Sequence, residues 1–303
     1  MVMAKRIILF LAINFLVMIT LSLILNLFHL QPYLNAYGLD VRSLLIFCLV
    51  WGMGGAFISL ALSRMMAKWM MGVRVIDPKT SNAQEQQLLS TVHSLAKQAL
   101  LPVVPEVGIF QSPEPNAFAT GPTKRKSLVA VSTGLLNRMS QKELEGVIAH
   151  ELAHINNGDM VTMTLLQGIV NAFVMFLARV LAYVFSGLGK NRQESSGGSY
   201  LTYTLSVFFF EIVFMILGSI IVCWFSRFRE FRADKGGAKL AGKEQMIAAL
   251  ESLKRMQEMK DPAKDQPSFQ TLKISTPKRS GWLALFGTHP PLEERIARLR
   301  SNN

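Results

Sequence analysis

Four apolar stretches, each long enough to cross a lipid bilayer, constrain the fold of this 303-residue chain more than any other feature. The first two, Ile7–Leu30 and Ser43–Ser63, contain no Lys, Arg, Asp or Glu. An α-helix rises about 1.5 Å per residue, so about 20 apolar residues cross the roughly 30 Å of hydrocarbon in a bilayer. We therefore expect residues 1–63 to form an N-terminal hairpin of two membrane spans. The first span is expected to remain as an anchor, because no small-residue cleavage site follows it before Gln31.

The other two stretches, Met160–Gly189 and Leu205–Phe225, each contain a charged residue, Arg179 and Glu211 respectively. A charge at membrane depth is costly unless it finds a partner or water. The two residues either pair across a helix hairpin or face a wet cavity, or Arg179 extends its charge to the membrane surface. The sequence leaves these alternatives open. We expect residues 160–226 to form a second apolar hairpin that lies wholly or partly in the membrane.

The balance of charges supports a membrane protein and gives its orientation. Only 17% of the residues are charged, whereas a soluble domain carries about a quarter. The net charge is +12, and basic residues precede the first span and follow the second: Lys5, Arg6, Arg64, Lys68, Arg74 and Lys79. This asymmetry places the N-terminus and residues 64–159 in the cytoplasm, as in an inner-membrane protein. Basic and aromatic residues are not interleaved, so no nucleic-acid partner is indicated.

Two polar segments remain, residues 64–159 and 227–303, and each is too short to bury a good core alone. We expect them to combine into one cytoplasmic domain that the second apolar hairpin interrupts. Residues 190–200 are expected to be a flexible linker and residues 259–281 a mobile loop, because both are rich in polar or turn-forming residues.

Local patterns predict the elements of the polar segments. Ser140 followed by Glu143 is a capping box, which predicts a helix that begins there and ends near Gly158. Residues 132–134 are typical of a turn. Apolar periodicity predicts the remaining elements: helices over 81–99, 228–253 (one or two) and 292–299, and strands over 107–110, after the break at Pro105, and 127–131.

The most informative motif, H-E-x-x-H, lies on the helix that the capping box opens. His150 and His154 are four residues apart, so their side chains lie about 40° apart around the helix, one turn along it, and reach the same ion. Glu151 is rotated by about 100° from His150, where it flanks the metal rather than binding it. A carboxylate in that place is typical of the general base of a zinc metalloprotease.

A catalytic zinc ion takes three protein ligands and keeps one position for water. The best source of the third ligand is the segment after the fourth apolar stretch, where Glu230 and Asp234 are four residues apart on one helix face. Glu230 would bind the metal, and Asp234 would hydrogen-bond to the imidazole of a ligand histidine. Glu143 and Glu145 are rivals, but they lie on the same helix as the histidines and reach round to the metal poorly.

The order of these motifs resembles the membrane-bound part of the M48 metalloprotease family, which includes the Ste24 prenyl-protein proteases. The resemblance covers essentially the whole chain and rests on segments 116–121, 150–154, 229–234 and 288–291. It implies an α+β domain of the gluzincin type attached to α-helical membrane spans. It also implies one zinc ion per chain, held by His150, His154 and Glu230, with Glu151 as catalytic base and Asp234 as a supporting partner.

The same resemblance gives roles to four further residues. His289 and Arg295 match residues that lie near the transition-state oxyanion in related enzymes, and Asn116 and Ala117 match an edge-strand motif that holds the substrate backbone. Without the resemblance, His289 is a residue before a Pro-Pro turn, Arg295 is an exposed helical residue, and Asn116 and Ala117 lie in a plain loop. Arg232 departs from the pattern, because relatives often have His there.

The function that the resemblance implies is cleavage of misfolded or damaged membrane proteins at the cytoplasmic face of the bacterial inner membrane. Two alternatives stay open. One is processing of prenylated C-terminal tails, as Ste24 does, although this chain has fewer spans than an enclosed chamber requires. The other is a membrane scaffold with a structural zinc ion, which would have no need of Glu151.

Overall fold

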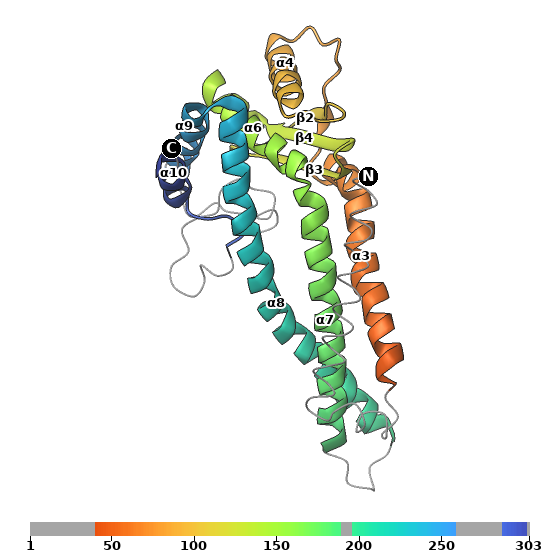
Figure 1. The fold of residues 1–303 in the computed structure, drawn as a ribbon. Helices are drawn as coiled ribbons and strands as arrows, with labels where there is room; N and C mark the ends of the chain where they lie inside the picture. The colour runs from red at the N-terminus through yellow and green to blue at the C-terminus, as the bar shows by residue number, and fades with distance from the viewer. Residues whose placement is uncertain (1–39, 189–195, 259–286, 302–303) are drawn as a thin grey trace. The chain divides into compact units, whose positions relative to one another are not determined.

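The structure is a computed structural model and describes residues 40–188, 196–258 and 287–301 (Figure 1). Its elements, in chain order, are α3 (Val41–Met70), β1 (Arg74–Val75), α4 (Ala83–Gln98), β2 (Glu106–Phe110), β3 (Ala117–Thr123), β4 (Lys126–Ser132), α5 (Thr133–Leu136), α6 (Gln141–Asn157), α7 (Asp159–Leu188), α8 (Ser196–Ala241), α9 (Lys243–Glu258) and α10 (Leu292–Ser301).

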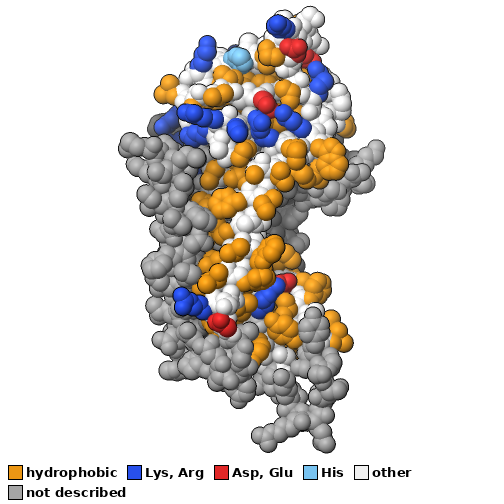
Figure 2. Space-filling model, turned by 90° about the vertical axis from the view of Figure 1, so that its right-hand side faces the viewer, with side chains coloured by type: hydrophobic (Ala, Val, Ile, Leu, Met, Phe, Trp, Pro, Cys, Tyr) orange, Lys and Arg blue, Asp and Glu red, His pale blue; other side chains and the backbone are white. Residues whose placement is uncertain are grey.

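Three of the described helices are long and apolar enough to cross a membrane. They cover Val41–Met70, Asp159–Ser186 and Leu201–Ala241, and each contains a strongly apolar stretch of 18 residues. Hydrophobic side chains cover much of the face shown in Figure 2, as lipid-facing helices require. The second, third and fourth apolar stretches are therefore confirmed as helices of membrane-spanning length, while Ile7–Leu30 lies outside the described residues.

Helix α8 begins earlier than the sequence suggested and joins the fourth apolar stretch to the first part of the helical region predicted over 228–253, whose second part is α9. It begins at Ser196, inside the segment 190–200 that was expected to be linker, so that expectation is wrong for residues 196–200. Once a helix exists, each added residue gains a hydrogen bond at little extra cost, so α8 extends into a Ser- and Gly-rich segment. The expected loop over 259–281 lies outside the described residues.

The described chain divides into two compact units, and one contains the apolar parts of α3, α7 and α8. Cys48 of α3 and Phe176 of α7 are buried in its core. A Cβ atom on Gly52 would lie 2.7 Å from the backbone nitrogen of Ala172, so only glycine permits this approach of α3 to α7. Arg179 Nη1 donates to Glu211 Oε1 at 2.8 Å, which is the first of the expected alternatives.

The second unit contains the sheet, whose strand order is β1-β2-β4-β3. β4 is parallel to β2 and antiparallel to β3, and β3 forms one edge of the described sheet. The strands β2 and β4 match the two predicted strands, with one residue more at the start of β2 and at each end of β4. β1 was not predicted, and β3 was expected only through the resemblance. The turn predicted over 132–134 is instead the start of the short helix α5.

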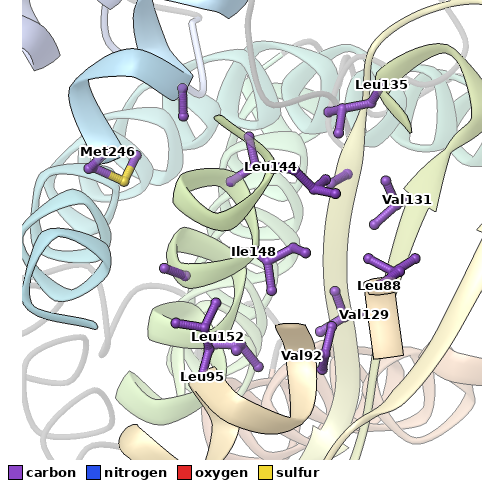
Figure 3. Close-up of a cluster of buried hydrophobic side chains, with 14 of the residues drawn as sticks. Leu88, Val92, Leu95, Val129, Val131, Leu135, Leu144, Ile148, Leu152 and Met246 are labelled. Atoms are coloured by element: carbon purple, nitrogen blue, oxygen red, sulfur yellow. The ribbon is translucent and has the colours of Figure 1, made fainter. Parts of the chain in front are cut away.

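Alternate residues of β4 enter two different cores, as a strand with both faces covered requires. Val129 and Val131 pack with apolar side chains of α4 and α6, such as Leu88 and Ile148 (Figure 3). Leu128 and Ala130 pack on the opposite face with Phe110, Phe118 and the end of α3. α6 therefore lies firmly against the sheet, which fixes the position of the H-E-x-x-H motif.

Both predicted ends of α6 are confirmed. The backbone nitrogen of Ser140 donates to Glu143 Oε2 at 2.8 Å, which completes the capping box. Gly158 ends the helix with φ of 73°, a left-handed conformation that glycine adopts without strain. Because α7 begins at the next residue, Asp159 turns back toward the last turn of α6.

Candidate metal centre

The last two turns of α6 bring both motif histidines to one point. His150 Nε2 and His154 Nε2 are 3.1 Å apart, and both side chains are buried. Glu151, between them on the helix, is also buried. The burial follows from the packing of α6 against the sheet on one side and against α9 on another.

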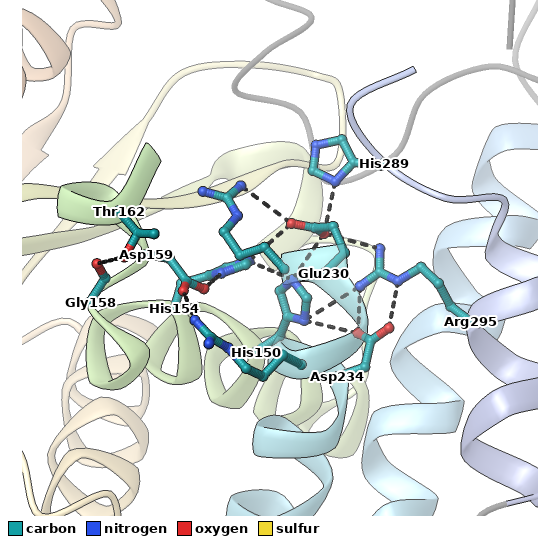
Figure 4. Close-up of polar contacts among 11 residues, drawn as sticks. His150, His154, Gly158, Asp159, Thr162, Glu230, Asp234, His289 and Arg295 are labelled. Atoms are coloured by element: carbon teal, nitrogen blue, oxygen red, sulfur yellow. Dashed lines mark hydrogen bonds and ion pairs between the residues drawn. The ribbon is translucent and has the colours of Figure 1, made fainter. Parts of the chain in front are cut away.

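Glu230 of α8 reaches the same point from the other side (Figure 4). Its side chain is 0% exposed. Its Oε2 lies 3.4 Å from His150 Nε2, and its Oε1 lies 3.2 Å from His154 Nε2. Of the carboxylates weighed for this position, Glu143 is used in the helix cap and in an ion pair with Arg255, and Glu145 accepts from Gln141.

Two glycines let α8 come this close to α6. A Cβ atom on Gly236 would lie 2.8 Å from Ala153 Cβ, and one on Gly237 would lie 3.1 Å from the backbone nitrogen of His150. Both distances are shorter than an ordinary carbon contact of about 3.5–4.0 Å. Gly237 lies two turns after Glu230 on the same face of α8, so the close crossing also carries Glu230 to the histidines.

The three groups fit a tetrahedral metal ion. Zinc binds imidazole nitrogen at about 2.0–2.1 Å, so two ligand atoms of a tetrahedral site are about 3.3 Å apart. His150 Nε2 and His154 Nε2 are 3.1 Å apart, and each lies 3.2–3.4 Å from a different oxygen of Glu230. With one ligand atom taken from each residue, the three atoms lie within 4.8 Å of one another. Two imidazoles and one carboxylate are also a usual ligand set of catalytic zinc, which leaves one position for water. His150, His154 and Glu230 would therefore hold the ion.

Each histidine is held from behind by a carboxylate, which fixes its tautomer. His150 Nδ1 is 3.0 Å from Asp234 Oδ1, and His154 Nδ1 is 2.7 Å from Asp159 Oδ2. With Nδ1–H donating to these oxygens, each Nε2 turns its lone pair toward the shared point. This role was expected for Asp234 but not for Asp159, although an acidic residue directly after a helix-ending glycine was a usable signal.

Two arginines hold the supporting carboxylates in turn. Arg295 Nε and Nη2 donate to the two oxygens of Asp234 at 2.8 and 2.6 Å, and Arg232 Nη2 donates to Asp159 Oδ1 at 2.6 Å. Arg295 is 1% exposed, so it is not the exposed helical residue that was one alternative. A direct contact of Arg295 with substrate stays a prediction. Arg232 thus contacts the carboxylate that holds His154.

Of the remaining expected residues, His289 contacts a proposed metal ligand, and Asn116 and Ala117 lie at the edge of the sheet. His289 Nδ1 is 2.8 Å from Glu230 Oε2. Asn116 and Ala117 lie at the start of the edge strand β3, where the backbone nitrogen of Ser132 donates to the carbonyl oxygen of Asn116 at 2.8 Å. The plain-loop alternative is therefore wrong for Ala117, which is the first residue of β3.

The buried charges of the site stabilise one another. Burial alone would lower the pKa of His150, but hydrogen bonds to Asp234 and Glu230 outweigh it and raise that pKa to about 9. Burial would raise the pKa of Glu230, but the neighbouring His289 and His154 hold it well below its usual range. Arg295 similarly lowers the pKa of Asp234 to about 2, against the effect of burial. The carboxylates are thus ionised and ready to pair with cationic groups.

A buried two-histidine, one-glutamate cluster with a carboxylate beside it, in a chain with apolar helices of membrane-spanning length, defines the class of membrane metalloproteases. The model of peptidase family M48 matches residues 82–303. The chain belongs to this family and is a metalloprotease, a hydrolase. The expected fold class, membrane helices with an α+β metalloprotease domain, is confirmed.

Individual relatives support the same assignment over the whole chain. The chain is 51% identical to the Protease HtpX homolog of Bacillus subtilis (strain 168) over 308 residues, covering 99% of this chain and 100% of the relative. It is 50% identical to the Protease HtpX homolog of Methylacidiphilum infernorum (isolate V4) over 300 residues, covering 98% of each. The crystal structure of S. mikatae Ste24p has a TM-score of 0.58 at 17% identity, covering 96% of this chain and 67% of that one, so it supports the fold.

Proposed function

We propose that this chain is a zinc-dependent endopeptidase of a bacterial cytoplasmic membrane that cleaves misfolded or damaged membrane proteins. The observation that carries the proposal is the meeting of His150 Nε2, His154 Nε2 and Glu230 at separations of 3.1–3.4 Å, with Glu151 adjacent on α6. A structural zinc site would not need the carboxylate of Glu151, which lies beside the ligands and is not one of them.

The chemistry follows from the positions of the residues. A bound zinc ion would polarise the peptide carbonyl and lower the pKa of water toward about 7. Glu151 accepts the proton of the attacking water and passes it to the amine that leaves when the C–N bond breaks. Nδ1 of His289 is held at Glu230, so its Nε2 is the ring nitrogen available to donate a hydrogen bond to the developing oxyanion.

The edge strand β3 is the proposed site for the substrate backbone. β3 pairs with β4 on one side in the described sheet, so an extended peptide can add to its other side by main-chain hydrogen bonds. The residues proposed to hold that peptide are Asn116 and Ala117, where the preceding loop enters β3. This mode of binding favours unfolded segments over folded ones, because a folded segment has its backbone groups already paired.

The position of the site along the chain suggests the substrate class. Glu230 follows the apolar stretch Leu205–Phe225 by five residues, and α7 begins five residues after His154. With so few residues between, the metal lies near the membrane surface, on the cytoplasmic side if basic residues mark that side. Cytoplasmic loops and tails of membrane proteins are then within reach.

The test is the substitution Glu151→Gln in the full-length protein. The proposal predicts zinc content equal to the parent and loss of cleavage of a denatured membrane protein by at least about 100-fold, the usual weight of a general base. Parent-like cleavage by Glu151→Gln would refute the catalytic role. A prenylated peptide tested in parallel distinguishes the Ste24-type alternative, which predicts faster cleavage of that peptide than of the denatured protein.

A further inference from the structure

A groove runs along the face of α8 that lies opposite Glu230. Its larger part is a cavity of about 650 Å³ between α8 and α10. Lys235 and Lys239 line it, and they lie about 140° and 180° around the helix from Glu230. None of the three proposed metal ligands lines this cavity. We call it, together with the smaller cavity described next, the α8–α10 groove.

The groove continues toward the apolar part of α8. A second cavity of about 270 Å³ shares Phe228, Phe231 and Arg298 with the first and extends to Trp224. Trp224 and Phe228 are 63% and 57% exposed, and Trp224 lies within the apolar stretch Leu205–Phe225. Aromatic side chains at this boundary are typical of the membrane–water interface. This end of the groove therefore presents two exposed aromatic side chains, beside the charged Arg227 and Glu294.

The other end is basic. Six of the eleven residues that line the larger cavity are Lys or Arg, and its acidic residue, Asp234, is bound by Arg295. Arg298 lies over the ring of Phe231 at 3.7 Å and pairs with Glu294 at 2.9 Å. Lys235 and Lys239 are exposed, and no ion pair or hydrogen bond joins their side chains to another described residue. The groove thus presents positive charge that the neighbouring described carboxylates leave uncompensated.

We propose that the α8–α10 groove binds one anionic phospholipid, with its phosphate headgroup on Lys235 and Lys239 and its acyl chains against Trp224 and Phe228. Phe228 and Lys235 are seven residues apart, which is about 10 Å along the helix, and lysine side chains that bend back toward the membrane shorten this distance. That separation matches a headgroup layer above hydrocarbon. A soluble anion would use the lysines but gain nothing from the aromatic end.

The experiment uses the full-length protein in bilayer discs of phosphatidylcholine, titrated with a fluorescent phosphatidylglycerol. A lysine near a membrane surface contributes about fivefold to the affinity for anionic lipid. The double variant Lys235→Gln/Lys239→Gln should therefore bind phosphatidylglycerol about 25-fold more weakly than the parent. The control Lys79→Gln/Lys97→Gln removes the same charge from exposed positions elsewhere and should bind like the parent. Phe228→Ser should weaken lipid binding and leave the binding of inorganic phosphate unchanged.

Several results would overturn the proposal. Parent-like affinity of Lys235→Gln/Lys239→Gln would remove the groove as the site, and equal weakening of the control variant would show only general charge attraction. Displacement of the lipid by inorganic phosphate at equal concentration would indicate a soluble anion. If Lys235→Gln/Lys239→Gln binds lipid like the parent but cleaves an acidic peptide more slowly, the groove is a substrate site and not a lipid site. Since the binding assay needs no catalysis, its outcome is independent of the proposed function.

Discussion

The close crossing of α6 and α8 predicts that one added methyl group will impair metal binding without touching a ligand. In Gly236→Ala the new Cβ atom would lie 2.8 Å from Ala153 Cβ. Carbon atoms in contact are about 3.5–4.0 Å apart, so the helices must separate by about 1 Å at this point. Ala153 is buried beside His154, so it has no free space into which it can move.

The effect on the metal follows from the tolerance of coordination bonds. Ligand distances of a metal site hold within about 0.2 Å, which is less than the separation expected between the helices that carry His154 and Glu230. We expect zinc affinity to fall by about 10- to 100-fold, the range seen when ligands lose their support. The free energy of unfolding should change little, because alanine gains about 1 kcal/mol in a helix interior and the overpacking costs about 1–3 kcal/mol.

The assay is equilibrium competition for zinc with a chelating dye, together with thermal unfolding of the metal-free protein. Gly55→Ala is the matched control, because a Cβ atom there meets nothing within 4 Å. Ala153→Gly removes the opposing methyl group, so the double variant Gly236→Ala/Ala153→Gly should recover most of the lost affinity. Parent-like zinc affinity in Gly236→Ala, or no recovery in the double variant, would refute the reasoning.

Three further predictions concern other contacts. Asp234→Ala leaves Arg295 buried without its bidentate partner and should lower the free energy of unfolding by about 3–5 kcal/mol; a Tm equal to that of the parent would contradict this. Glu211→Gln removes the partner of Arg179 and should lower the Tm in lipid, and the exchange Arg179→Glu/Glu211→Arg should restore it; a failure to restore would mean that the charges act separately. Glu143→Gln should cost about 0.3–1 kcal/mol at neutral pH, because it removes a negative charge from the first turn of α6 and from the ion pair with Arg255. Although burial acts to raise it, the pKa of Glu143 is lowered by its hydrogen bonds with Ser140, so the stabilisation is present above the ordinary pKa of 4.5 and is lost as the pH falls below it. Unfolding curves of parent and Glu143→Gln should therefore converge in acid, and a constant difference would disprove the assignment.

Strong local signals allowed much of this fold to be predicted. The apolar stretches are long and the capping box of α6 is complete, so helices of spanning length and the ends of α6 follow from the sequence. The strand β3 begins with Ala117 and contains Gly121 and Pro122, which weaken a strand pattern. The two-residue strand β1 carries no local signal, because its pairing with β2 depends on the rest of the sheet.

The contacts of the candidate site were likewise predictable only in part. The spacing of His150 and His154 determines their meeting, because it lies within a single helix. The joining of Glu230 to them depends on Gly236 and Gly237, whose closeness to α6 is a property of two packed helices. The role of Asp159 depends on the sharp turn at Gly158, and burial of Arg295 depends on α10 packing against α9. The contacts of Glu230 and Arg295 join residues far apart in the chain, so local patterns do not reveal them, whereas Asp159 lies five residues after His154 and had a local signal.

The central claim is that one ion is shared by two imidazoles of α6 and the carboxylate of α8. Anomalous X-ray scattering at the zinc edge, from crystals of Glu151→Gln grown with zinc, tests it most directly. The claim predicts one peak per chain at about 2.0–2.2 Å from His150 Nε2, His154 Nε2 and a carboxylate oxygen of Glu230. A peak elsewhere, or a peak at the histidines with the carboxylate of Glu230 turned away, would contradict it.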